Sequence, residues 1–365
     1  MLRVLVVDDS TVSRRLLRHM LESEAGITVV GEAVNGEDAV RKAARLHPDV
    51  ITMDVYMPVM DGYEATRQIM SRTPKPIVMI SAGHEPAEVR WSFRALEAGA
   101  LTVLAKPTGP LSPQYEAQAA ALVSTVRTMA EVKVVTRRAP RAPASASQPG
   151  PAVASFERSA AGRPPAGAPG ASVPIELVAI GASTGGPAAL AKILGGLGPD
   201  FHVPIMIVQH IAPGFERGLV DWLNSVSSLT AAVAEHDQPL RRGHVYVSPQ
   251  DVHLGTAAGR IALSPAAPIG GHRPSATHLF QAVARSHGPR AIGVILTGIG
   301  SDGASGLADL HERGGLILAQ DEASSVVFGM PKAAIELGLA DQVVPLDAMA
   351  RALRDAVDAR AKLAG

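Results

Sequence analysis

The first third of the chain alternates short aliphatic runs with amphipathic stretches of helical length. Five strands are predicted, at residues 2–7, 28–33, 50–53, 77–81 and 101–104, with helices between them and a last helix over residues 113–131. Alternation of this kind is typical of strand-helix-strand units, which assemble into parallel sheets. Residues 1–131 are therefore predicted to form a small doubly wound α/β domain.

The same alternation resumes at residue 175. Near-continuous apolar runs occupy residues 176–182, 204–209, 291–296 and 316–320, as expected of strands that are covered on both faces. Helices are predicted at residues 186–197, 214–227, 277–287, 304–313 and 346–363, and the polar middle contains short strand candidates at 244–247 and 260–263. Residues 175–365 are predicted to be a second doubly wound α/β domain with an irregular middle.

Residues 132–174 differ from both neighbours in composition. From residue 133 to residue 174 the segment holds eight prolines and one phenylalanine among many Ala, Gly and Ser residues. Such a composition buries too little apolar surface to order itself, so it predicts a flexible linker. Six basic residues against one glutamate give this linker a net charge of 6 − 1 = +5, which keeps it solvated.

Composition excludes several classes of protein. Lys plus Arg and Asp plus Glu both number 34, which argues against a nucleic-acid partner. Cysteine is absent, which excludes disulfides and thiolate chemistry, and no apolar run approaches the roughly 18 residues of a membrane span. The apolar run at the N-terminus is too short for a signal peptide. We expect a cytoplasmic protein without direct membrane insertion.

Polar residues follow the predicted strands of the first domain. Asp8 and Asp9 come after the first strand, Asp54 after the third, Ser81 ends the fourth and Lys106 follows the fifth. The carboxyl ends of parallel strands meet at one edge, so these side chains are expected to converge. Clustered carboxylates favour Mg²⁺, and Asp54 is placed to attack phosphorus while Lys106 and Ser81 stabilise the phosphoryl oxygens. Each aspartate taken singly is more often a helix cap.

Through these side chains, the segment from residue 1 to about 130 resembles the response-regulator receiver family. The resemblance is carried by VDDS at 7–10, DVYMPVMDG at 54–62 and KP at 106–107. It implies a flavodoxin-like parallel sheet of order 2-1-3-4-5, phosphorylation of Asp54 by a chemotaxis-type histidine kinase, and Mg²⁺ bound by Asp8, Asp9, Asp54 and the main-chain carbonyl of Tyr56. The chain departs from the family at Val103, where many receivers have an aromatic switch residue, and at Tyr56, where glutamate is common in esterase-linked receivers.

A second constellation lies in the later domain. Gly181-x-Ser183-x-Gly185 follows an apolar strand and opens a helix, which matches the nucleophile-elbow pattern, although a glycine-rich turn can also hold a phosphate. His210 ends the next strong strand, and Asp302 lies between a later strand and a helix. Three strand ends thus predict a Ser183–His210–Asp302 triad, in an order unlike that of the α/β-hydrolases.

Residues 175 to about 345 resemble the catalytic domain of chemotaxis protein-glutamate methylesterases, which also deamidate receptor glutamines. The segments that carry the resemblance are GASTGG at 181–186, QHIAPGF at 209–215, HRPS at 272–275, TGIGSDG at 297–303 and QDEASSVVFGMP at 320–331. It implies Ser183 as nucleophile, His210 as base, Asp302 as its partner, and an oxyanion site around Thr184, Gly185 and Ile299. Ile299 and Ser301 replace residues that are frequently Met and Asn.

Together these patterns predict a phosphorylation-activated hydrolase that acts on methylated chemoreceptors, needs no cofactor for the ester reaction and is a monomer. We expect the receiver to cover the esterase edge until Asp54 is phosphorylated. Three alternatives stay open: a nucleotide-binding output domain, a scaffold with an inactive esterase fold, and a DNA-binding output. The first lacks an acidic ribose ligand at a strand end, the second is disfavoured by the intact triad, and the third lacks a basic helix-turn-helix pattern.

Overall fold

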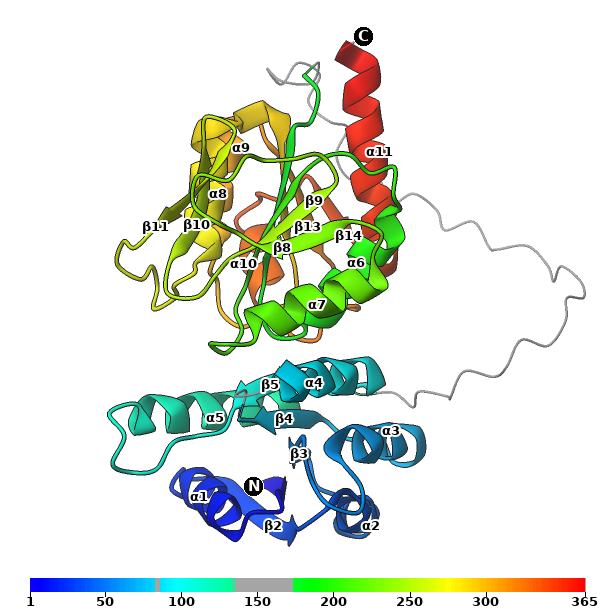
Figure 1. The fold of residues 1–365 in the computed structure, drawn as a ribbon, viewed down its shortest axis with the longest axis vertical. Helices are drawn as coiled ribbons and strands as arrows, with labels where there is room; N and C mark the ends of the chain where they lie inside the picture. Colours follow the sequence, from blue (N-terminus) through cyan, green and yellow to red (C-terminus); the bar gives the residue numbers. More distant parts are fainter. Residues whose placement is uncertain (83–85, 133, 135–172, 365) are drawn as a thin grey trace, which may run out of the picture.

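The computed structural model describes residues 1–82, 86–132, 134 and 173–364, which contain two parallel sheets, each flanked by helices on both faces (Figure 1). Within those residues no helix is long and apolar enough to cross a bilayer. The predicted linker lies almost entirely outside the described residues.

The first sheet has the strand order β2-β1-β3-β4-β5, and all of its strands are parallel. The strands are β1 (Leu2–Val7), β2 (Ile27–Ala33), β3 (Val50–Asp54), β4 (Ile77–Ser81) and β5 (Thr102–Ala105). The helices are α1 (Thr11–Glu22), α2 (Gly36–Leu46), α3 (Gly62–Arg72), α4 (Pro86–Ala98) and α5 (Tyr115–Ala130). Helices α1 and α5 pack together on one face, and α2, α3 and α4 follow one another on the other. The receiver order is confirmed.

The second sheet has the order β14-β13-β12-β6-β7-β9-β8, again all parallel. Its strands are β6 (Leu177–Ala182), β7 (Ile205–Gln209), β8 (Thr230–Val233), β9 (His244–Val247), β12 (Ala291–Ile295), β13 (Leu316–Gln320) and β14 (Gln342–Val344). The chain builds outward from β6 on one side and later from β12 on the other. This reversal between β6 and β12 is where a doubly wound sheet opens a crevice at its carboxyl edge.

Helices cover both faces of the second sheet. They are α6 (Gly186–Leu197), α7 (Glu216–Val226), α8 (Ala276–Ser286), α9 (Ala304–Glu312), α10 (Met330–Glu336) and α11 (Leu346–Ala364), with a 3₁₀ turn at Gly288–Arg290. Helix α6 contacts α7 and α11, and helix α9 contacts α8 and α10. An antiparallel hairpin of β10 (His253–Ala257) and β11 (Arg260–Ser264) packs on α8.

Several elements were absent from the sequence prediction. They are the strands β8, β10 and β14 and the helix α10, which span three to seven residues each. So few residues show too little periodicity to separate a strand or helix from a loop. The helix predicted at residue 214 begins at Glu216, because Gly214 has a φ of 88° and interrupts the helix there.

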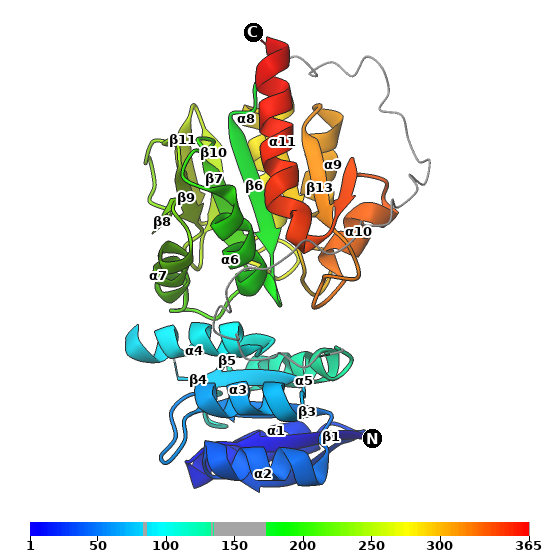
Figure 2. The ribbon, with the colours of Figure 1, turned by 90° about the vertical axis from the view of Figure 1, so that its right-hand side faces the viewer.

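The receiver lies against the carboxyl edge of the second sheet, toward which β6 points (Figure 2). Helix α4 contacts α6 and α7, and the rings of Phe93 and Trp222 stack with centroids 5.4 Å apart. The Trp222 indole also donates a hydrogen bond to the Glu97 carboxylate. Val326 and Val327, from the loop after β13, pack against a hydrophobic cluster of the receiver. The two domains therefore share an interface at this edge.

Candidate active sites at two sheet edges

The first candidate site lies at the carboxyl edge of the receiver sheet. Asp8, Asp9 and Asp54 each offer a carboxylate oxygen, and these oxygens lie within 4.8 Å of one another. The Lys106 ammonium reaches two of them, at 2.7 Å from Asp54 Oδ2 and 3.1 Å from Asp8 Oδ2. The Lys106 amide donates to the carbonyl of buried Ser81, which places both residues beside the cluster. Asp8, Asp9, Asp54 and Lys106 thus gather as the strand ends predicted, and the Ser81 main chain lies beside Lys106.

The surroundings of Asp54 in this cluster disfavour the charged form of its carboxyl group. Burial raises the pKa of Asp54 to about 6, the negative charge of Asp8 adds to the rise, and Lys106 opposes it. Burial also disfavours the charge on Lys106, but its ion pairs with Asp54 and Asp8 outweigh that effect and raise its pKa. One lysine does not neutralise three acids, so the cluster retains a demand for positive charge.

The donor set fits a hard divalent cation. Carboxylate oxygens are the ligands that Mg²⁺ prefers, and it keeps several waters, which a partly open site permits. Asp8 is fully buried and Asp9 is exposed, so the cluster has a protein side and a solvent side. Among the described residues, the buried Asp8 Oδ2 is matched only by its ion pair with Lys106. Tyr56 lies in the following loop with 42% of its surface exposed.

The second candidate site begins with the turn after β6. Gly185 adopts a φ of 79°, a region that favours glycine, and a Cβ there would lie 2.6 Å from the side chain of Val326. The Gly186 amide closes the turn on the Ser183 carbonyl at 2.8 Å. The Ser183 amide donates to the Thr297 carbonyl at 3.0 Å, which ties the turn to the loop after β12. Ser183 therefore occupies the crevice between β6 and β12.

His210 follows β7 and connects two of the predicted triad members. Its Nε2 lies 2.9 Å from Asp302 Oδ2. Its Nδ1 is buried and has no hydrogen-bond partner among the residues that the structure describes. With Nε2–H donated to the carboxylate, Nδ1 carries the lone pair and can accept a proton. In the predicted triad, that proton would come from the Ser183 hydroxyl. The Ser183 and His210 side chains are not hydrogen-bonded to each other in this structure.

Gln209 holds the serine turn and the histidine together. Its side-chain amide donates to the Ser183 carbonyl at 2.7 Å and to the His210 carbonyl at 2.9 Å. The strand β7 therefore fixes both the base and the backbone of the nucleophile. Gln209 has no predicted role from the sequence, where its place directly before His210 is the available signal.

Asp302 is held as a carboxylate by the first turn of α8. It accepts hydrogen bonds from Ser275 Oγ at 2.7 Å, from the Ala276 amide at 2.7 Å and from the Thr277 amide at 3.1 Å. Burial alone would raise the pKa of Asp302, but the hydrogen bonds from His210 and Ser275 hold it well below its usual range. A helix N-terminus adds positive potential at the same place.

A second histidine covers the ring of the first. The imidazoles of His272 and His210 stack with centroids 4.1 Å apart and planes 1° from parallel. Burial, and then the neighbouring His210, lower the pKa of His272, which favours a neutral ring in the stack. Gly270 and Gly271, both with positive φ, form the turn that closes Ile269 on His272. His272 and Ser275 were noted only as part of a motif, and the helix cap at Ser275 was the signal for its position.

The predicted oxyanion residues surround the same crevice. The Thr184 carbonyl accepts a hydrogen bond from Thr297 Oγ1 at 2.9 Å, which orients the turn. Gly298 passes close to the nucleophile, since a Cβ on it would lie 2.7 Å from the Ser183 Cβ. Ile299 follows Gly298, partly exposed. Whether Thr184, Gly185 and Ile299 donate to an oxyanion stays a prediction.

Comparisons with known proteins identify both domains. Family models match as a response regulator receiver domain over residues 4–112 and as a CheB methylesterase over residues 178–353. A protein-glutamate methylesterase/protein-glutamine glutaminase of Myxococcus xanthus is 48% identical over 97% of each chain. Proteins with the same name from Syntrophus aciditrophicus and Geobacter metallireducens are 44% and 45% identical, over 97% of this chain and 97% and 98% of theirs. The chain therefore belongs to the protein-glutamate methylesterase/protein-glutamine glutaminase family, with a receiver domain ahead of its methylesterase domain.

Proposed function

We propose that the chain hydrolyses γ-glutamyl methyl esters on chemoreceptors, and deamidates receptor glutamines, with Ser183 as nucleophile, His210 as base and Asp302 as its partner. The observation that carries this proposal is the hydrogen bond from His210 to Asp302 beside the Ser183 turn, at the reversal point of the sheet. The division into domains at 1–131 and 175–365 is part of the proposal.

The reaction follows from these groups. His210 Nδ1 accepts the Ser183 proton as the hydroxyl oxygen bonds to the ester carbonyl carbon. The protonated histidine then delivers that proton to the methoxy oxygen, the carbon–oxygen bond breaks and methanol leaves. Water, deprotonated by His210, attacks the acyl-serine and restores the serine and a glutamate carboxylate. With ammonia as the leaving group, the same steps convert glutamine to glutamate.

Stabilisation of the oxyanion is assigned to backbone amides near the turn. The Ser183 amide already donates to the Thr297 carbonyl, so the donors have to come from other residues. The amides of Thr184 and Gly185 lie just before α6, where the helix N-terminus favours negative charge. Ile299 directly follows Gly298, which passes close to Ser183.

The receiver controls this activity through Asp54. We assign Asp8, Asp9, Asp54 and the Tyr56 carbonyl to a Mg²⁺ site. Mg²⁺ bound there would neutralise the acids and a phosphoryl group. A chemotaxis-type histidine kinase is the proposed phosphodonor. The Asp54 carboxylate bonds to phosphorus as the donor's bond breaks, while Lys106 and the Ser81 hydroxyl hold the phosphoryl oxygens.

The domain interface suggests how phosphorylation acts. Phe93 and Glu97 of α4 hold Trp222 of α7, and Val326 and Val327 connect the catalytic edge to the receiver. A receptor segment could not approach this edge while the receiver lies on it. Phosphorylation of Asp54 would shift the population toward an open arrangement. We propose a cytoplasmic monomer that meets its receptors at the membrane surface without inserting.

Methanol release from membranes with methylated chemoreceptors tests the proposal. Wild-type protein and Ser183→Ala are compared with and without a small acyl-phosphate donor and Mg²⁺. The rate is expected to rise with the donor and to fall about 10⁶-fold in the variant, the order found when a catalytic serine is removed. Release that persisted in Ser183→Ala would refute the serine mechanism, and a wild-type rate indifferent to the donor would refute the regulation.

A further inference from the structure

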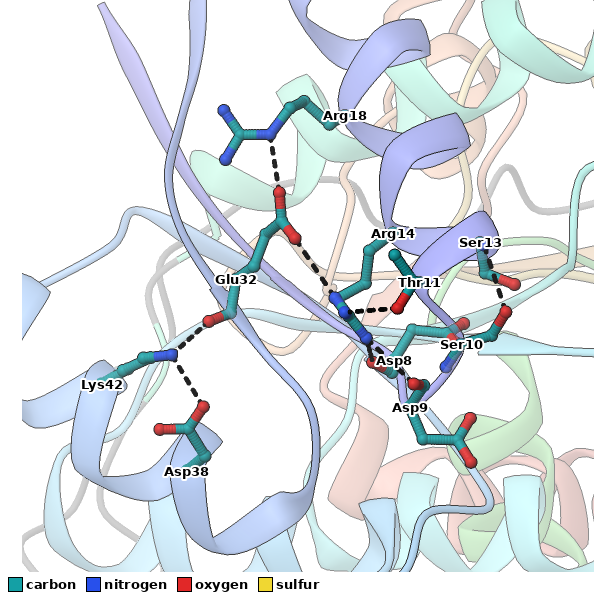
Figure 3. Close-up of polar contacts among 10 residues, drawn as sticks. All are labelled: Asp8, Asp9, Ser10, Thr11, Ser13, Arg14, Arg18, Glu32, Asp38 and Lys42. Atoms are coloured by element: carbon teal, nitrogen blue, oxygen red, sulfur yellow. Dashed lines mark hydrogen bonds and ion pairs between the residues drawn. The ribbon is translucent and has the colours of Figure 1, made fainter.

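A buried arginine lies behind the acidic cluster of the receiver. Arg14, on the first turn of α1, is 8% exposed, and its guanidinium folds back toward the turn after β1 (Figure 3). Nη1 donates to the carbonyl oxygens of both Asp8, at 2.8 Å, and Asp9, at 3.0 Å. Nη2 donates to Thr11 Oγ1 at 3.1 Å. The residue therefore binds the main chain of the two acids whose side chains face Asp54.

The charge of Arg14 is balanced on its far side. Its Nε pairs with Glu32 Oε2 at 3.2 Å, and Arg18 Nε holds the other oxygen of Glu32 at 2.8 Å. Burial tends to raise the pKa of Glu32, but Arg18 and Arg14 outweigh it and keep the carboxylate charged. A buried guanidinium is costly unless its charge is paired and its N–H groups are satisfied. Here the charge is paired with Glu32, and each guanidinium nitrogen donates at least one hydrogen bond.

Arg14 does not occupy the carboxylate oxygens of Asp8 and Asp9. Asp8 Oδ1 accepts from the Ser10 amide at 2.8 Å, and Oδ2 faces Lys106. The Asp9 carboxylate points away from the guanidinium in Figure 3. Of Asp8 and Asp9, Arg14 contacts only the carbonyl oxygens, so it restrains the backbone without competing for their carboxylates.

We propose that Arg14, held by Glu32, is a positioning residue for the Mg²⁺ site: it fixes the turn that carries Asp8 and Asp9, so that their carboxylates are preorganised for the cation. This inference rests on the proposed Mg²⁺ site. Residues that orient metal ligands through a second layer of hydrogen bonds commonly change metal affinity by about 10- to 100-fold when they are removed.

The charge of Arg14 and its hydrogen bonds to the turn predict opposite changes in Mg²⁺ affinity when Arg14 is replaced, so the direction of the change is a test. Arg14 is positive, so its charge alone repels Mg²⁺, and loss of that charge should tighten binding. If Arg14 acts by fixing the turn, its loss should weaken binding although a repulsive charge has gone. The variant Arg14→Met removes both the charge and the donors at similar length. Arg14→Lys keeps the charge but loses the planar fork that reaches two carbonyls.

The experiment is a calorimetric titration of the full-length protein with MgCl₂, accompanied by the unfolding midpoint in EDTA. Arg14→Met is expected to weaken Mg²⁺ binding about tenfold or more, Arg14→Lys to weaken it in the same direction, and Glu32→Gln to weaken it less. The matched control is Arg15→Met, which removes an exposed charge from the same helical turn and should change the affinity less than about twofold. Asp9→Asn tests the site itself.

The outcomes separate the two levels of the argument. If Asp9→Asn does not weaken binding, the proposed Mg²⁺ site is wrong. If Asp9→Asn does so but Arg14→Met binds Mg²⁺ as tightly as Arg15→Met, or more tightly, the positioning role is wrong. A lower unfolding midpoint with an unchanged Mg²⁺ affinity would also overturn it, since Arg14 would then be only structural. If Arg14→Met does not fold, the affinities of Arg14→Lys and Glu32→Gln decide.

Discussion

Asp54 and Asp302 occupy equivalent places in the two domains and have opposite electrostatics. Asp54 ends the central strand β3, Asp302 lies in the loop after the central strand β12, and each side chain is 4% exposed. Yet the pKa of Asp54 is raised to about 6, whereas that of Asp302 is held well below its usual range. Burial raises both, so the neighbours decide the outcome.

The neighbours differ in number and in sign. Asp302 accepts hydrogen bonds from four donors, which are His210, Ser275 and the amides of Ala276 and Thr277. Asp54 has Lys106 and its own following amide, and it faces the negative charge of Asp8. The charge of Asp302 is therefore fully balanced within the protein, whereas Asp54 retains a demand for positive charge that the proposed Mg²⁺ would meet. A stable carboxylate suits a permanent catalytic partner, and an unsatisfied one suits a switch.

The largest expected effect concerns Asp302 in the proposed catalytic triad. Asp302→Asn should lower kcat for methanol release by about 10⁴-fold, because an amide NH₂ facing Nε2 favours the tautomer in which Nδ1 is protonated and cannot accept the serine proton. The control Asp358→Asn, at an exposed position on α11, should leave kcat unchanged. A variant that kept more than a tenth of wild-type kcat would show that Asp302 does not set the tautomer.

The next largest effect concerns Asp54 in the receiver and is measured as a change in the free energy of unfolding. The folded pKa of Asp54 is about 6 and its ordinary value is 3.8, so the folded state holds a proton that the unfolded chain releases between these values. Without Mg²⁺, Asp54 thus contributes a penalty that is absent below about pH 4, grows with rising pH and is complete above about pH 6. It amounts to about 3 kcal/mol.

Asp54→Asn should remove this penalty. In EDTA the variant is expected to be more stable than wild type by up to about 3 kcal/mol at pH 7.5, with a smaller difference at pH 5, as measured by urea unfolding. Glu116→Gln, at an exposed position on α5, serves as the control. A difference between Asp54→Asn and wild type that did not grow with pH would contradict the raised pKa.

The smallest effect tests the coupling between the two edges. Glu97→Ala removes the acceptor of the Trp222 indole and should raise the rate without a phosphodonor about fivefold, the order of one hydrogen bond to an exposed charged group. With donor and Mg²⁺ the variant and wild type should converge, because both are then open. Arg94→Ala is the control, since Arg94 lies over the Tyr63 ring within the receiver. A loss of basal rate in Glu97→Ala would mean that the contact supports catalysis.

Much of the fold and both sites could be predicted from the sequence. Apolar runs located nine of the parallel strands, and polar residues directly after them located Asp54, Lys106, Ser183 and His210. These inferences are local, since a residue at the end of a parallel strand lies at the carboxyl edge whatever the rest of the chain does. Short elements such as β8 and α10 escaped because their few residues carry too weak a pattern.

The sequence by itself determined which residues could do chemistry: three acids and a lysine at one sheet edge, and a serine, a histidine and an aspartate at another. Only the tertiary structure decided their state. Packing between elements raises the pKa of Asp54, lowers the pKa of Asp302 and stacks His272 on His210. It also places the Arg14 guanidinium against the carbonyl oxygens of Asp8 and Asp9. Protonation, orientation and preorganisation depend on which donors, charges and rings lie within a few ångströms, and those neighbours are set by how helices and strands pack.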